Sequence, residues 1–148
     1  MSSSIDKLKQ KYEASRKYML THVEFTMILM SYPAILVSAA DNRVSILEYI
    51  LVNDTAIQQV KNYVNSDINT KDLEAFFLRE IDFLVENIHD WEDQMLQGVK
   101  KLIETVPAFA KPIQELMQKT ADVHHGTSDL EKRKIEAICN TLGLPLIN

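Results

Sequence analysis

Apolar residues along this chain recur at three- and four-residue spacings, which is the pattern of amphipathic helices. No stretch alternates apolar and polar residues long enough to indicate a strand, and only three glycines and four prolines interrupt the pattern. The clearest stripe, from Leu73 to Ile88, lasts more than four turns, and the first helix continues or breaks near Thr21. The pattern predicts an all-α fold, a compact multi-helix bundle with helices over about residues 4–20, 22–40, 46–64, 70–88, 91–106, 107–120 and 129–142.

The segment from Phe25 to Ala40 carries no charge and is apolar nearly all round. Its sixteen residues would span only about 24 Å as a helix, whereas the hydrocarbon core of a bilayer is about 30 Å thick. We therefore expect a buried central helix and no membrane span. Pro33 lacks an amide hydrogen, so it should kink this helix or restart it with Ser31 as the cap.

Composition limits the classes of protein to which the chain can belong. A length of 148 residues, of which 46% are hydrophobic, suits one domain over residues 1–148. The net charge of −5 provides no surplus of cations for nucleic-acid phosphates, so nucleic acid is not an expected partner. The single cysteine, Cys139, excludes an intrachain disulfide, and the N-terminus is too charged for a secretory signal, so we expect a cytoplasmic protein. Cys139 lies on an apolar stripe, where a buried thiol is inert.

One sequence motif occurs twice, over residues 40–48 and 121–131. It consists of Ala-Asp, a short polar loop, and then Ser-x-x-Glu at the start of an apolar segment. In Ser-x-x-Glu, the serine hydroxyl accepts a hydrogen bond from the glutamate amide, and the glutamate side chain accepts one from the serine amide. This capping box explains the serines and glutamates as helix starts without any ligand. The repetition itself predicts two pseudo-symmetric helix-turn-helix halves.

The same turns are candidates for a metal site. If a pseudo-twofold axis brings them together, four carboxylates converge, and such oxygen ligands suit a hard divalent cation. His124, next to His125 in the second turn, would shift the preference towards zinc, although adjacent loop histidines are more often merely exposed. The candidate ligands are Asp41, Glu48, Asp122, Glu131 and His124.

The repeated motif resembles the TerB-like domains of tellurite-resistance and stress-response systems. The resemblance extends past the second copy, which continues through Arg133-Lys134-Ile135-Glu136-Ala137-Ile138-Cys139-Asn140-Thr141-Leu142-Gly143-Leu144. The similarity covers roughly residues 20–144. It implies an all-helical cytoplasmic domain without catalytic residues, with acidic turns suspected of binding metal. The family usually has Asp-Gly at the turn, whereas here Asn42 follows Asp41 and Val123 follows Asp122.

Two alternatives accompany this hypothesis. The first is a helical interaction module without metal, which binds a protein partner or a second copy of the chain. Trp91, flanked by Asp90 and Glu92, is expected to be partly exposed and is a candidate anchor for such a partner. The methionines, Met19 among them, are expected to fill gaps in the core or to line an adaptable groove.

The second alternative is a metal-dependent oxidase at Glu86-x-x-His89. This spacing places a carboxylate and an imidazole on one face of a helix, as in di-iron carboxylate bundles. A di-iron site needs the motif twice, and the chain contains it once. An interhelical or solvated pair is the simpler interpretation of Glu86 and His89.

Overall fold

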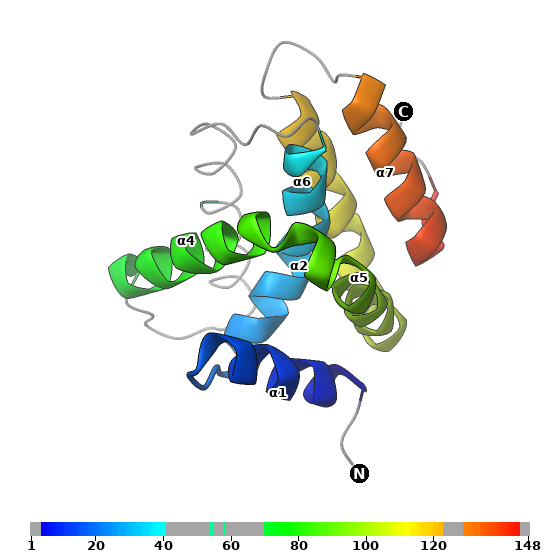
Figure 1. The fold of residues 1–148 in the computed structure, drawn as a ribbon. Coiled ribbons are helices and arrows are strands. Elements are labelled where there is room, and N and C mark those ends of the chain that lie inside the picture. Colours follow the sequence, from blue (N-terminus) through cyan, green and yellow to red (C-terminus); the bar gives the residue numbers. More distant parts are fainter. Residues whose placement is uncertain (1–3, 41–53, 55–57, 59–69, 123–128, 146–148) are drawn as a thin grey trace.

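The computed structural model describes residues 4–40, 54, 58, 70–122 and 129–145. This part of the chain is all α-helical and contains no strand, which confirms the predicted fold class (Figure 1). Its elements are six α-helices and one short 3-10 helix: α1 (Ser4–Arg16), α2 (His22–Ala39), α4 (Thr70–Glu86), α5 (Ile88–Thr105), η1 (Pro107–Phe109), α6 (Ala110–Asp122) and α7 (Asp129–Leu142).

Helix α2 is the centre of the bundle. It packs against α4, α5, α6 and α7, and every residue from Met27 to Ser38 is buried. It is long and apolar enough to cross a bilayer, yet 72% of it is buried inside the protein, so it is no clear membrane span. The helix runs without interruption past Pro33, so the restart considered above is wrong. Ser31, the expected cap, is buried instead, and its hydroxyl has no hydrogen-bond partner among the residues that the structure describes.

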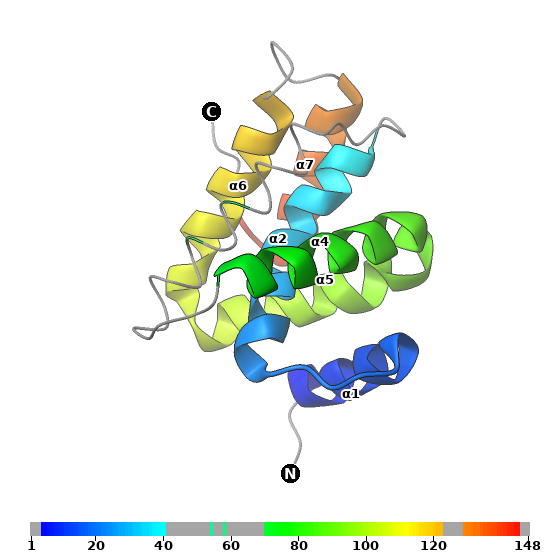
Figure 2. The same ribbon diagram turned by 90° about the vertical axis from the view of Figure 1, so that its left-hand side faces the viewer.

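Helices α2 and α6 lie side by side and run in the same direction (Figures 1 and 2). Their C-terminal ends, Ala39 and Asp122, therefore lie at the same end of the bundle. These two helices directly precede the two copies of the repeated sequence motif. The pseudo-symmetry of the two halves stays a prediction, because residues 41–53 and most of 55–69 lie outside the described part.

The predicted helix over 70–88 ends two residues early. Asn87 separates α4 from α5, and its side-chain amide donates to the Phe83 carbonyl oxygen over 2.9 Å. The later boundaries agree closely with the sequence. Helix α5 ends before Pro107, and α7 ends before Gly143, which has the left-handed φ of 72° that favours glycine.

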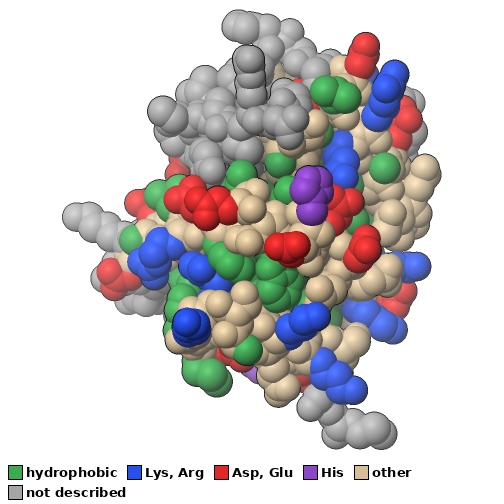
Figure 3. Space-filling model, in the orientation of Figure 1, with side chains coloured by type: hydrophobic (Ala, Val, Ile, Leu, Met, Phe, Trp, Pro, Cys, Tyr) green, Lys and Arg blue, Asp and Glu red, His purple; other side chains and the backbone are tan. Residues whose placement is uncertain are grey.

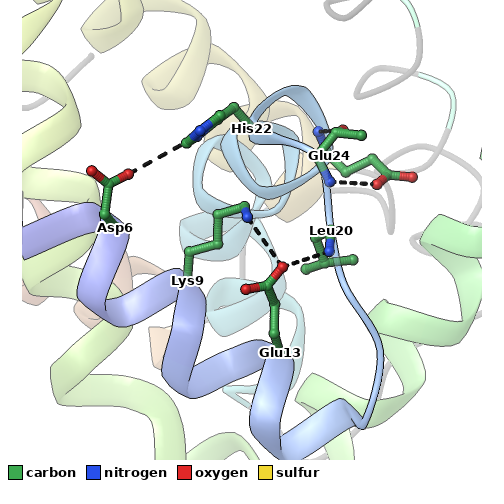
Figure 4. A network of polar contacts seen from close by, with 7 residues as sticks. Asp6, Lys9, Glu13, Leu20, His22 and Glu24 are labelled. Carbon is green, nitrogen blue, oxygen red and sulfur yellow. Dashed lines mark hydrogen bonds and ion pairs between the residues drawn. The ribbon is translucent and has the colours of Figure 1, made fainter. Parts of the chain in front are cut away.

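The turn between α1 and α2 decides between the two alternatives near Thr21, because the first helix breaks there and does not continue into α2. Lys17 ends α1 with a φ of 66°, and Thr21 caps α2 through a reciprocal capping box with Glu24 (Figure 4). Glu13 holds the turn closed, because its carboxylate accepts from the Leu20 amide at 2.6 Å and from the Lys9 ammonium at 3.1 Å. The Leu20 hydrogen bond stabilises the charged form most, so it lowers the pKa of Glu13.

Candidate ligand-binding groove

A groove of about 330 Å³ lies between the C-terminal end of α2 and the N-terminal halves of α5 and α7. It is open to solvent, and most of its lining is apolar. Leu130, from α7, is 52% exposed and is one of three exposed large hydrophobic residues in the described part of the chain. The apolar lining consists of Leu36, Ala39, Ala40, Ile88, Leu130 and Ala137.

Polar side chains from α5 and α7 complete the groove. The Lys134 ammonium lies 3.1 Å from both carboxylate oxygens of Glu92, so these two charges compensate each other. Arg133 is exposed and forms no ion pair within the described residues. His89 is exposed at the start of α5. On the face of the molecule drawn in Figure 3, acidic, basic and hydrophobic side chains are interspersed. The groove thus combines an apolar surface with a guanidinium that forms no ion pair with the described residues.

A second polar cluster lies inside the bundle around Glu80 of α4. The Glu80 side chain is fully buried, and its carboxylate accepts from the Tyr12 hydroxyl at 2.7 Å and from the Tyr18 hydroxyl. Arg16 donates through Nε at 2.9 Å and Nη2 at 3.1 Å, in the bidentate geometry that guanidinium and carboxylate favour. Protein donors thus already engage both carboxylate oxygens, so this cluster needs no ligand and joins α1 to α4.

The cluster raises the pKa values of its three donors, Tyr12, Arg16 and Tyr18. Burial, followed by the charge of Glu80, raises the pKa of Tyr12, and the hydrogen bond to Glu80 raises the pKa of Arg16. Burial is also the main cause of the raised pKa of Tyr18. Each of these shifts favours the protonated form of the donor, which is the form that hydrogen-bonds to Glu80.

Aromatic rings surround this ion pair. The Arg16 guanidinium lies 4.3 Å from the centre of the Phe83 ring, and the Tyr12 ring lies 5.3 Å from Trp91. Trp91 is only 6% exposed, so the expectation of a partly exposed interface anchor is wrong. Its acidic neighbours point elsewhere on α5, while the indole packs into the aromatic cluster. Met19 is 81% exposed, so it fills no gap in the core, and the alternative that it lines a groove stays a prediction.

Two of the five predicted metal ligands lie within the described residues. Asp122 is the exposed last residue of α6, and its Oδ1 accepts from the Gln118 amide over 3.1 Å. Glu131 is buried in the first turn of α7. Asp41, Glu48 and His124 lie outside the described part, so the convergence of all five is untested. Within that part, no group of three or more histidine, cysteine, aspartate or glutamate side chains is placed to hold a metal ion.

The Glu86-x-x-His89 spacing does not fall on one helix. Glu86 ends α4 and His89 belongs to the first turn of α5, with the break at Asn87 between them. The shared helical face that the oxidase hypothesis required is therefore absent at these residues.

Cys139 is 2% exposed on α7, as the sequence predicted. Burial raises the pKa of its thiol, which lowers the fraction of reactive thiolate. The cysteine is thus a core residue.

Comparison of the chain with protein-family models, curated proteins and solved structures finds no match.

Proposed function

We propose that this chain is a non-catalytic TerB-like domain of tellurite resistance or a related chemical or metal stress response, acting in the cytoplasm. In this proposal its two acidic turns bind a divalent metal ion. The chemistry is that of carboxylate oxygens, supplied by Asp41, Glu48, Asp122 and Glu131, with His124 as a nitrogen ligand.

One observation supports this proposal above the others. Helices α2 and α6 run side by side in the same direction, so the two copies of the repeated motif begin at the same end of the bundle. Convergence of the two turns was the condition that the metal hypothesis required. The buried position of Glu131 in the first turn of α7 also favours a role for its carboxylate beyond surface solvation.

Calorimetric titration with Zn²⁺, Mn²⁺ and Ca²⁺ tests the metal site. We expect saturable binding by the wild-type chain and at least about a tenfold loss of affinity when Asp41→Asn and Asp122→Asn are combined, because each change removes a charged oxygen ligand. A matched control combines Asp82→Asn and Asp93→Asn, two exposed aspartates on α4 and α5. Absence of saturable binding, or equal losses in the two double variants, would rule out the proposed site.

A second candidate function, binding of a protein segment without metal, is favoured by the groove between α2, α5 and α7. An open apolar groove between helices is a common place for a partner helix or an extended segment to bind. This function does not depend on the acidic turns, so the two candidates are separable by experiment.

A further inference from the structure

We infer that the groove binds a segment of a partner protein that presents an acidic side chain beside an aliphatic one. This inference rests on the second candidate function above and specifies the chemistry of its ligand. The relevant surface combines the apolar residues Ile88, Leu130 and Ala137 with the guanidinium of Arg133.

The apolar half of the ligand follows from Leu130. This leucine is 52% exposed although it borders a concave surface of about 330 Å³, so an aliphatic side chain placed there would remove apolar area from both molecules from water. A groove of this size accommodates a few side chains of a bound segment. Because it is open to solvent, the backbone of that segment can pass along it.

The acidic half follows from the distribution of charge. Glu92 already occupies Lys134 with both carboxylate oxygens, whereas Arg133 has no ion pair in the described part of the chain. Arg133 is therefore the cation available to a ligand, and a guanidinium binds a carboxylate through two parallel hydrogen bonds. A basic partner would instead meet Arg133 as a like charge, which selects against it.

The inference can be tested with a phage-displayed library of random dodecapeptides, panned on the immobilised full chain in EDTA. Enriched peptides should share an aspartate or glutamate next to leucine, isoleucine, valine or methionine. Their affinities are then measured by fluorescence anisotropy with synthetic peptides. EDTA removes divalent metal, so the outcome bears on the groove alone, while the calorimetric titration bears on the turns alone.

Arg133→Glu should lower the affinity of the chain for these peptides by about tenfold or more, because the charge-assisted hydrogen bonds are lost and a charge repulsion replaces them. A peptide whose acidic residue is changed to lysine should regain affinity for this variant. The control is Lys132→Glu, which makes the same change of charge at the preceding exposed position of α7, outside the groove lining. Arg133 is exposed, so its replacement should leave the circular dichroism spectrum unchanged.

Three results would overturn the inference. The first is that panning enriches no peptide, or enriches peptides that lack an acidic residue. The second is that the Lys132→Glu control loses as much affinity for the peptides as Arg133→Glu does. The third is that the chain self-associates in a concentration-dependent manner and that Arg133→Glu abolishes this association. The third result, measured by sedimentation velocity, would identify a second copy of the chain as the occupant.

Discussion

At the scale of single residues, the most consequential side chain is that of Glu80, which belongs to none of the sequence motifs described above. Glu80 lies three residues after Phe77 and four before Leu84, both fully buried, so it belongs to the buried stripe of α4. A carboxylate in such a stripe indicates a buried partner. The partner itself could not be predicted, because Tyr12 and Arg16 lie more than 60 residues away in the sequence.

Removing this carboxylate should destabilise the whole protein. Glu80→Ala leaves the buried Tyr12 hydroxyl and part of the Arg16 guanidinium without their acceptor, and loss of one partner of a buried ion pair costs about 3 kcal/mol or more. Glu80→Gln keeps the volume and should cost less. The free energy of unfolding, measured by urea denaturation followed by circular dichroism, checks both values.

A control for this prediction is Glu86→Gln, which removes an exposed carboxylate from the end of the same helix. It should change the free energy of unfolding by less than about 0.5 kcal/mol. If Glu80→Ala were no more destabilising than Glu86→Gln, the cluster would not be what joins α1 to α4.

The candidate site residues illustrate the limit of residue-level prediction in both directions. Cys139 was placed correctly, because the apolar period around it is long and unambiguous. Trp91 was misplaced, because the adjacent acidic residues suggested exposure, although neighbours in a helix point in different directions. Arg133 had no distinguishing pattern, since its place beside a groove depends on how α7 packs against α2 and α5.

At the scale of helices, most of the described elements follow from the sequence. Apolar periodicity, Pro107 and Gly143 predicted α5, α6 and α7 with small errors at the ends. The break at Asn87 was missed, because the apolar stripe of α4 continues through Ile88 and no glycine or proline interrupts it. The packing of α1 against α5 was also beyond prediction, since it depends on a close approach at Gly98.

Gly98 allows α1 and α2 to approach α5 closely. A Cβ atom at this position would lie 2.6 Å from Leu8 Cδ2 and 3.1 Å from Leu29 Cδ2, so both leucines would have to move. We predict that Gly98→Val destabilises the protein by about 1 to 3 kcal/mol through overpacking, as measured by urea denaturation.

Gln97→Val is the matched control for this helix, because it introduces the same side chain at the adjacent, exposed position of α5. It carries the cost of a β-branched residue in a helix without the steric conflict. Equal free energies of unfolding for the two variants would mean that α1 and α5 can separate at Gly98 at no cost.

At the scale of the whole molecule, the described helices form one core centred on α2. Cys139 belongs to this core and is the only cysteine, so its reaction with a thiol reagent reports on opening of the fold. We predict that 5,5′-dithiobis(2-nitrobenzoate) labels the native protein at least about 1,000-fold more slowly than the urea-unfolded chain, as expected for a domain whose stability is 5 kcal/mol or more.

The labelling rate should rise with urea concentration in parallel with global unfolding measured by circular dichroism. Labelling of the native protein at nearly the rate of the unfolded chain would show instead that α7 opens independently of the core. Glutathione under the same conditions controls for the effect of urea on the reagent.

The relative position of α1 has a practical consequence. Helix α1 lies at one end of the bundle, and α2 and α6 terminate at the opposite end (Figures 1 and 2). A protein tethered to a sensor surface through an attachment on α1 would therefore present the ends of α2 and α6, with the adjoining groove, to the solution. The same orientation allows a fluorophore on α1 to report on binding at the far end without obstructing it.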